Sequence, residues 1–333
     1  MKRPLFMAAP LIVAALVATG GNAGRTVDPR VGYVAFSGTV PTLRVLDGVP
    51  LVGFLRAEKE LPIRGAVRYV SPTQGSGPAL TVFGKQDYDL VVAPLFNAGP
   101  VDAVSRRFPH VDFLVIDAQP GIPPTRRAAN IHRAVFRAEQ AGYLAGYLSA
   151  LMAGRSGGRS MISAVGGFRF YGVARWIVGY RAGAKKADPR IAVRVDYSED
   201  FANPAKCRRV ALSQIAAGSR VVFDVAGGCG VGALRAAREK GVWGVGVDTD
   251  QSYLGPHILT SAVSRLDLGV YNTIRQLVRG KLAPGTAVVY DVRNGGVELG
   301  RISPKVPKSF LRRLAKIRAQ IAAGTIKVPR PSG

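Results

Sequence analysis

The sequence is poor in cysteine, histidine and acidic residues: its 333 residues include 2 Cys, 3 His and 21 Asp plus Glu, against 46 Lys plus Arg. Two cysteines cannot staple a small disulfide scaffold, and His110, His132 and His257 are scattered without the spacing of metal ligands. We therefore predict no metal site. The apolar fraction of 47% is large enough for buried cores, so the formal charge of +25 does not indicate a disordered chain.

Long apolar runs are also rare. The run at residues 5–17 follows Lys2 and Arg3 and precedes small residues at 19–23, which is the three-part pattern of a secretory signal. A bilayer-spanning helix needs about 20 apolar residues, so an uncleaved anchor is the alternative interpretation. We predict a signal peptide over residues 1–23 and an exported protein, periplasmic or secreted.

A lipid anchor is not expected. A lipoprotein signal places a cysteine at the cleavage point, whereas the two cysteines of this chain are Cys207 and Cys229. The positive charge favours anionic surfaces. Because the basic residues are dispersed and not interleaved with aromatic residues, we predict no nucleic-acid partner. A noncatalytic protein that adheres to anionic envelope polymers is one alternative function.

The alternation of apolar runs predicts an α/β fold. Short β-branched runs alternate with helical patterns about every 25 to 30 residues, the rhythm of βαβ units. The predicted strands are 31–36, 66–70, 88–94, 112–117, 160–165, 191–197, 220–225, 243–248, 258–262, 287–291 and 297–299. The predicted helices are 51–60, 101–108, 139–153, 173–187, 204–217, 231–240, 266–279 and 308–322.

These elements divide into two doubly wound lobes. We predict an N-terminal lobe at 28–128 plus 258–282 and a C-terminal lobe at 129–257 plus 283–333, with a crossing at the Pro-Gly stretch 119–124. Two such lobes place a ligand cleft between the carboxyl ends of both sheets.

A glycine-rich turn offers an enzymatic alternative. Residues 228–233 read Gly-Cys-Gly-Val-Gly-Ala, which fits the G-x-G-x-x-A pattern of dinucleotide-binding folds, and Asp248 lies twenty residues further on. An exported NAD(P)-dependent oxidoreductase is therefore a second alternative. Such a turn also serves any ligand that approaches a helix N-terminus, and a single match is weak. We predict no cofactor and no catalysis.

The two cysteines are predicted to lie near each other. Cys207 falls in the first turn of a predicted helix, and Cys229 falls just past the strand that follows it. A helix in a βαβ layer runs antiparallel to that strand, so both cysteines lie at the end that faces the cleft. A disulfide is compatible with this arrangement and with export; two unpaired buried thiols are the alternative.

Polar and aromatic residues follow the predicted strands and are candidate ligand contacts. They are Asp117, Gly166, Gly167, Phe168, Phe201, Gly227, Gly228 and Asp248. Carboxylates accept hydrogen bonds from vicinal hydroxyls, and a ring such as Phe201 or Phe96 stacks on a planar group. The combination suits a sugar or a nucleoside. The alternative for the aspartates is capping of the following helix.

Several segments in one order resemble the basic membrane protein family of ABC-transporter substrate-binding proteins, the purine nucleoside receptor type. They are Tyr-Arg-Ala-Gly-Ala-Lys-Lys-Ala-Asp-Pro at 180–189, Phe-Ala-Asn-Pro-Ala-Lys at 201–206, Val-Ala-Gly-Gly-Cys-Gly at 225–230, Gly-Val-Asp-Thr-Asp-Gln-Ser-Tyr-Leu at 246–254 and Leu-Thr-Ser at 259–261. The resemblance covers about residues 88–329 and implies two type I periplasmic-binding-protein-like lobes, a nucleoside-like small-molecule ligand, an ABC transporter permease as partner and a monomer.

By position, the resemblance implies a base-stacking role for Phe201, backbone contacts from Gly227 and Gly228, and a ribose-hydroxyl acceptor in Asp248. The N-terminal signature departs from the family. Residues 35–44 read Ala-Phe-Ser-Gly-Thr-Val-Pro-Thr-Leu-Arg, without the family's Asp-Gly-Gly turn and its base-reading Asp and Asn. Purine specificity therefore does not follow from the resemblance, although Phe36 is a candidate for stacking. The family's basic residue after the Thr-Ser pair falls at Ser264, next to Arg265.

Overall fold

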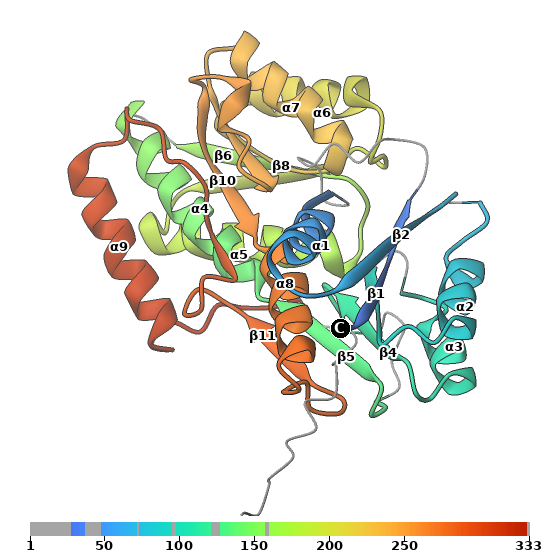
Figure 1. Ribbon diagram of the computed structural model, residues 1–333. Coiled ribbons are helices and arrows are strands. Elements are labelled where there is room, and N and C mark those ends of the chain that lie inside the picture. Colours follow the sequence, from blue (N-terminus) through green and yellow to red (C-terminus); the bar gives the residue numbers. More distant parts are fainter. Residues whose placement is uncertain are drawn as a thin grey trace, which may run out of the picture.

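The computed structural model describes residues 28–36, 48–71, 73–94, 98–120, 127–156 and 160–331. The predicted signal peptide (1–23) and Phe96 lie outside these ranges, and of Phe36 only the backbone, at the end of a strand, is described. Figure 1 shows two lobes, each a twisted sheet with helices on both faces. This architecture confirms the predicted α/β fold with two doubly wound lobes. In the described part of the chain, no helix has the length and apolar character needed to span a bilayer.

The first sheet is parallel throughout, in the order β11-β5-β4-β3-β1-β2. Its strands are β1 (Arg30–Phe36), β2 (Arg64–Val70), β3 (Leu90–Pro94), β4 (Asp112–Ile116), β5 (Ile131–Phe136) and β11 (Ala287–Tyr290). Its helices are α1 (Gly48–Glu60) and α8 (Leu266–Val278) on one face and α2 (Gly77–Lys85) and α3 (Val101–Arg107) on the other. Alternate residues of a strand point to opposite faces. In β4, Leu114 and Ile116 therefore join the core on the α1 and α8 side, while Phe113 and Val115 join the core on the α2 and α3 side.

The second sheet has the order β12-β10-β9-β8-β6-β7, in which β12 alone among these strands runs antiparallel to its neighbour. Its strands are β6 (Met161–Gly166), β7 (Ala192–Tyr197), β8 (Ser219–Val225), β9 (Trp243–Asp248), β10 (Ile258–Ser264) and β12 (Val297–Leu299). Its helices are α4 (Ala138–Ala153), α5 (Tyr171–Ala187), α6 (Pro204–Ala216), α7 (Gly227–Glu239) and α9 (Lys308–Ala322), with the short 3-10 turns η2 (Gly154–Ser156) and η3 (Ser252–Leu254). Helices α6 and α7 cover the outer face, and α9 lies outside α4 (Figure 1).

Helices α4 and α5 pack closely because glycines face backbone across the contact. Gly142 and Gly146 of α4 lie directly against carbonyl oxygens of α5. Gly179 and Gly183 of α5 lie in the same way against carbonyl oxygens of α4. A Cβ atom at any of these positions would collide with the neighbouring backbone, so the packing of the second lobe depends on all four.

The strand pairing corrects the predicted boundaries between the lobes. Residues 131–136 and 287–290, expected in the C-terminal lobe, form β5 and β11 of the first sheet, and β10, expected in the N-terminal lobe, pairs within the second. The described chain therefore crosses between lobes after β5, after β10 and after β11. The crossing predicted at 119–124 is wrong, because β4 and β5 are neighbours in one sheet. Partner choice among strands depends on contacts far apart in the sequence, which local periodicity does not report.

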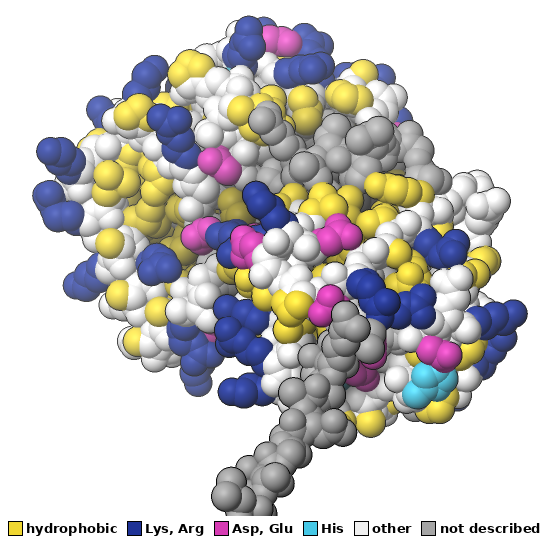
Figure 2. Space-filling view, in the orientation of Figure 1, with side chains coloured by type: hydrophobic (Ala, Val, Ile, Leu, Met, Phe, Trp, Pro, Cys, Tyr) yellow, Lys and Arg dark blue, Asp and Glu magenta, His cyan; other side chains and the backbone are white. Residues whose placement is uncertain are grey.

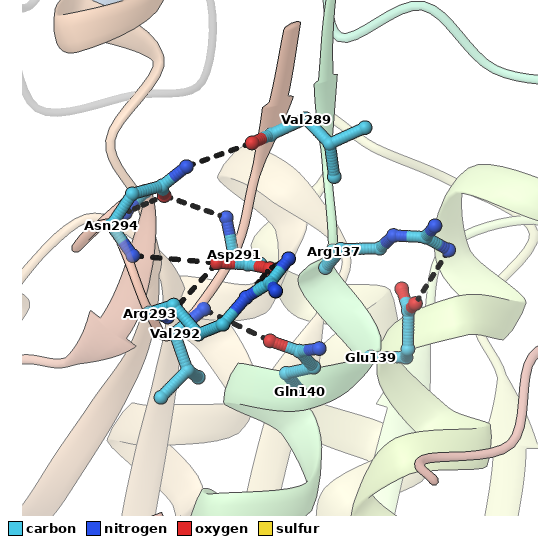
Figure 3. Close-up of polar contacts among 9 residues, drawn as sticks. Arg137, Glu139, Gln140, Val289, Asp291, Val292, Arg293 and Asn294 are labelled. Atoms are coloured by element: carbon cyan, nitrogen blue, oxygen red, sulfur yellow. Dashed lines mark hydrogen bonds and ion pairs between the residues drawn. The ribbon is translucent and has the colours of Figure 1, made fainter. Parts of the chain in front are cut away.

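The three crossings are hydrogen-bonded to one another. The Arg137 N–H, after β5, donates to the Tyr290 carbonyl at 2.8 Å, and the Arg265 N–H, after β10, donates to the Gly296 carbonyl at 2.9 Å. Figure 3 shows the third crossing, where Asp291 accepts hydrogen bonds from the N–H groups of Arg293 and Asn294. Gln140 of α4 accepts from the Val292 N–H at 2.9 Å. The base of the interlobe region is thus a single bonded unit.

Candidate ligand-binding site

In each lobe the strand order reverses beside the first strand, as β3-β1-β2 and as β8-β6-β7. In doubly wound sheets, ligands bind in the crevice at the carboxyl ends of the strands at this reversal. In the first lobe these ends are Phe36 of β1 and Pro94 of β3, and the residues that follow them in the sequence, 37–47 and 95–97, lie outside the described ranges. In the second lobe, β6 ends at Gly166 and is followed by a bend at Gly167, and β8 is followed by Gly227 and Gly228 in the first turn of α7; we call these two pairs the glycine turns. The described residues at a strand reversal are therefore mainly those of the second lobe.

Phe201, in the loop after β7, lies against both glycine turns. Its carbonyl accepts a hydrogen bond from the Cys229 N–H at 2.9 Å, and Gly227 and Gly228 lie beside it. A Cβ atom on Gly167 would collide with the Phe201 ring, so only glycine fits there. The structure thus brings five predicted residues to one place in the fold. They are Gly166, which is the last residue of β6, Gly167, Phe201, Gly227 and Gly228.

Three phenylalanine rings lie together here: Phe168, Phe170 and Phe201. We call this group the aromatic crevice, after the crevice that doubly wound sheets form at the strand reversal. The ring centroids of Phe168 and Phe201 are 5.1 Å apart in an edge-to-face arrangement, and those of Phe170 and Phe201 are 6.0 Å apart. Phe168 remains 41% exposed. Edge-to-face contacts fix ring orientation, so the crevice presents an oriented aromatic surface. Phe170 was not singled out by the sequence analysis.

A disulfide joins the helices beside the aromatic crevice. It links Cys207 of α6 to Cys229 of α7, whose Cα atoms are 5.6 Å apart. Because the Cys229 N–H also holds the Phe201 carbonyl, this crosslink fixes the start of α7 relative to the loop that carries Phe201.

Asp117 and Asp248 occupy equivalent positions in the two lobes. Asp117 follows β4 and Asp248 ends β9, and each of these strands is third in the order of its sheet. Both residues adopt the left-handed backbone conformation, with φ of 61° and 64°. This conformation is uncommon for a residue with a side chain, and such residues cluster at functional sites. The two aspartates mark matching positions at the carboxyl ends of both sheets.

The carboxylate of Asp117 is bound to Arg175 of the other lobe. The guanidinium donates to Oδ2 of Asp117 at 2.6 Å, and Gln119 Nε2 donates to the same oxygen at 2.9 Å. Burial would lower the pKa of Arg175, but the charges of Asp117, Glu139 and Asp248 raise it above its ordinary value. Arg175 is not among the site residues predicted from the sequence.

Two buried oxygens beside this ion pair have unused acceptor capacity. Oδ1 of Asp117 and Oε1 of Gln119 have no hydrogen-bond partner among the described residues. Buried acceptors are normally bonded to protein, water or ligand. These two atoms are therefore available to a hydroxyl or an amine that reaches the region between the lobes.

Asp248 lines a separate space, which we call the interlobe hollow. It has a volume of about 500 Å³ and is lined by Val49 and Val52 of α1 together with Asp248, Ser264, Arg265 and Glu298. Phe201 is not among its lining residues. The structure therefore places the predicted residues in two regions, the aromatic crevice and the interlobe hollow.

Arg265 contributes a cation to the interlobe hollow, but it is already paired. It forms ion pairs with Asp267 at 2.8 Å and with Glu298 at 3.4 Å. Hydrogen bonding to Asp267 and the charges of both acids raise the pKa of Arg265. Ser264, at the position of the family's basic residue, is the last residue of β10 and buried. The hollow thus combines acidic groups with a cation that is held in place.

A buried carboxyl lies behind the glycine turn of the aromatic crevice. Asp224 of β8 is fully buried and accepts a hydrogen bond from the Ala226 N–H at 2.9 Å. Burial, with a smaller effect from the charge of Asp248, raises the pKa of Asp224 to about 8. The carboxyl is therefore mostly protonated at neutral pH.

Internal packing accounts for Gly230, the second glycine of the dinucleotide-like pattern, and for the neighbouring Gly232. Gly230 lies directly against the Asp224 carboxyl, and Gly232 lies against the Pro204 carbonyl of α6. Helix α7 begins at Gly227, so the whole pattern, residues 228–233, is helical. Within the described ranges, no three His, Cys, Asp or Glu side chains are grouped so that they could hold a metal ion.

Comparison with known proteins identifies relatives over most of the chain. The family described as "ABC transporter substrate-binding protein PnrA-like" matches residues 57–332. The ABC transporter nucleoside-binding protein BmpA of Lactococcus lactis is 29% identical over 264 residues, which cover 74% of this chain and 72% of BmpA.

Two solved structures share the fold. An ABC transporter solute-binding protein from Aeropyrum pernix superposes with a TM-score of 0.79 at 21% identity, covering 92% of this chain and 94% of that one. A transcriptional activator from Bacillus halodurans superposes with a TM-score of 0.74 at 19% identity, covering 91% of this chain and 100% of that one. At these identities the likeness concerns the fold alone.

Proposed function

The chain belongs to the family of PnrA-like ABC transporter substrate-binding proteins, and from this premise we propose that it binds a nucleoside or a related small polar ligand between its lobes. In this proposal the protein is exported, acts as a monomer without a lipid anchor, and delivers its ligand to the permease of an ABC transporter. Binding involves no covalent chemistry in this proposal.

The observation that carries the proposal is the aromatic crevice at the strand reversal of the second lobe. There an exposed ring, Phe168, and the ring of Phe201 lie beside the glycine turns, and the lack of a side chain at Gly167 makes room for the Phe201 ring. Aromatic rings stack on planar bases, and stacking contributes about 1–3 kcal/mol per base. The acceptors of Asp117, Gln119 and Asp248 suit the hydroxyl groups of a sugar.

Two further facts favour a ligand that both lobes share. Asp117 and Asp248 have matching strained conformations in opposite lobes, and the bonded crossings place a pivot at the base of the region between them. Closure around a ligand would complete contacts from both sheets, which couples binding to the angle between the lobes. A related protein, BmpA of Lactococcus lactis, carries the name of a nucleoside-binding protein.

Isothermal titration calorimetry against a panel of nucleosides and sugars tests the proposal. We expect heat with at least one nucleoside at a stoichiometry of one per chain. Phe201→Leu should weaken that binding about 10- to 100-fold through lost stacking. Asp248→Asn should also weaken it, whereas the matched control Asp87→Asn should not, because Asp87 has the same left-handed backbone but lies between α2 and β3.

The result that would overturn the proposal is no heat with any nucleoside or sugar from protein purified without refolding. NAD and NADP belong in the same panel. Binding of these dinucleotides alone would favour the oxidoreductase alternative. Unchanged nucleoside affinity in both site variants would show that Phe201 and Asp248 do not contact the ligand.

A further inference from the structure

The C-terminal part of the chain carries charge of one sign. Residues 301–333 contain nine Lys and Arg and no Asp or Glu. The nine basic residues are exposed: Arg301, Lys305, Lys308, Arg312, Arg313, Lys316, Arg318, Lys327 and Arg330. Figure 2 shows Lys and Arg side chains along the left edge of the molecule, where Figure 1 places α9. Basic residues occur over the whole surface, and residues 301–333 form one region in which no acidic residue offsets them.

Helix α9 arranges three of these cations in one row. Leu314, Ile317 and Ile321 form its buried stripe, and the helix packs against α4. Lys308, Arg312 and Lys316 follow one another at intervals of four residues, which places them in a line on the opposite, exposed face. We call these three residues the basic row. The exposed Ala315 and Ala319 beside it leave the row sterically open.

The basic row has no internal counterion. Among the described residues, none of its three members takes part in a salt bridge. Like charges four residues apart on a helix repel one another. The row is therefore destabilising for α9 by itself, and an external anion would relieve the repulsion.

Two neighbouring arginines have internal roles and are distinct from the row. The Arg313 guanidinium lies over the Tyr147 ring of α4 at 5.8 Å, and Arg318 donates to the Val292 carbonyl at 3.4 Å. These contacts help fix α9 on the second lobe. The row itself is left to face solvent.

We propose that the basic row is a docking surface for an anionic lipid bilayer. The row lies on the convex outer face of a helix, which suits a flat array of headgroups, and Leu311 beside it is 37% exposed. Residues 301–331 contain a single aromatic residue, the partly buried Phe310. Proteins that bind single-stranded nucleic acid stack its bases on aromatic rings, so the lack of an exposed ring in these residues favours lipid headgroups over single-stranded nucleic acid.

The mode of docking follows from the burial of the apolar stripe. Because Leu314, Ile317 and Ile321 are used in the core of the protein, α9 adheres by charge and does not insert into the hydrocarbon. Each Lys or Arg near an anionic bilayer contributes about fivefold in affinity. The docking is therefore reversible and screened by salt.

Sedimentation with lipid vesicles tests the proposal. We expect the full chain to bind vesicles of phosphatidylglycerol and phosphatidylcholine at low salt, and not vesicles of phosphatidylcholine alone. The triple variant Lys308→Gln, Arg312→Gln and Lys316→Gln should lose roughly 100-fold in vesicle affinity. Its control is the triple variant Lys186→Gln, Arg190→Gln and Lys240→Gln. This variant also loses two lysines and one arginine, but from exposed positions outside the basic row.

The control variant should keep its vesicle affinity within about threefold of the unmodified chain. Thermal unfolding of both variants checks that α9 remains folded. The proposal is overturned if the two variants lose affinity equally, since net charge alone would then explain binding, or if the basic-row variant binds as well as the unmodified chain. Equal competition by a soluble single-stranded oligonucleotide would assign the row to polyanions in general and would also overturn it.

Discussion

Arg175 of α5 and Asp117 at the end of β4 form a buried ion pair between the two lobes, with 2.6 Å between the guanidinium nitrogen and the carboxylate oxygen. Both side chains are about 6% exposed, so neither charge is well solvated. The pair connects the second lobe to a strained residue of the first, and Glu139 and Asp248 add to the field on the guanidinium. Arg175 is thus a buried cation whose charge is stabilised by acidic groups of both lobes.

Removing the arginine should be far more damaging than removing an exposed one. Arg175→Met leaves Asp117 buried without its partner, and we expect the free energy of unfolding in urea to fall by about 3–5 kcal/mol. Adding Asp117→Asn should recover part of that loss, because asparagine tolerates the left-handed backbone and carries no charge. Arg208→Met, which breaks the exposed pair with Glu239, is the control and should change stability little. Similar losses for both arginine variants would contradict the assigned role.

The buried Asp224 should make stability fall as pH rises. Its pKa is about 8 in the folded chain against 3.8 in the unfolded one, so between these values the unfolded chain loses a proton that the folded chain keeps. The free energy of unfolding then decreases by up to about 1.4 kcal/mol per pH unit from this group. Asp224→Asn keeps the acceptor for Ala226 but does not titrate.

Urea unfolding at pH 5, 6 and 7.5 checks this expectation. The slope of stability against pH should be less negative in Asp224→Asn than in the unmodified chain, and the two curves should differ most at pH 7.5. Parallel curves would show that Asp224 does not retain its proton in the folded state.

The disulfide should stabilise the second lobe through its loop. Cys207 and Cys229 are 22 residues apart, and closing a loop of that size contributes about 3 kcal/mol by the chain-entropy model. We expect the double variant Cys207→Ala and Cys229→Ala to unfold at correspondingly lower urea concentration. Reductant should destabilise the unmodified chain and leave the variant unchanged; an effect of reductant on both would point to another cause.

Gly146 should tolerate no side chain. Alanine normally favours a helix over glycine by about 1 kcal/mol, but a Cβ atom here meets the Tyr180 carbonyl of α5. Gly146→Ala should therefore lower stability by about 1–3 kcal/mol despite its higher helix propensity. Gly154→Ala, at the end of the same helix with open space around it, should change thermal stability little. An increase in melting temperature for Gly146→Ala would contradict the observed packing of α4 on α5.

Most elements were predictable from periodicity because their apolar residues repeat at the spacing of a strand or a helix. Two were missed. Helix α2 is only nine residues long and begins Gly77-Pro78, which reads as a turn. Strand β5 contains His132 and Arg133, which interrupt its apolar pattern. In the structure His132 is nevertheless buried, with its Nε2 atom 3.1 Å from Oδ1 of Asp112. A short helix and a strand that contains basic residues give weak local patterns.

The site was predictable where it follows strand ends and not where it depends on partners. The glycine turns and Phe201 come together because they follow adjacent strands of one sheet. Asp117 was foreseen as a ligand contact or a cap, but its ion pair with Arg175 was not, since nothing local distinguishes Arg175 from the other arginines. Its place on an otherwise apolar helix face near Val173 and Trp176 is the available signal, and it is a faint one.

The bonded crossings at Arg137, Arg265 and 290–296 restrict how the halves of the molecule can move. A single linker would let one half swivel about its own bonds. Three backbone segments that are hydrogen-bonded side by side resist twisting of one lobe relative to the other. Bending about these segments is therefore the easier motion. A ligand that enters between the lobes on the side away from the crossings must therefore leave on that same side, because the hydrogen-bonded crossings close the other side.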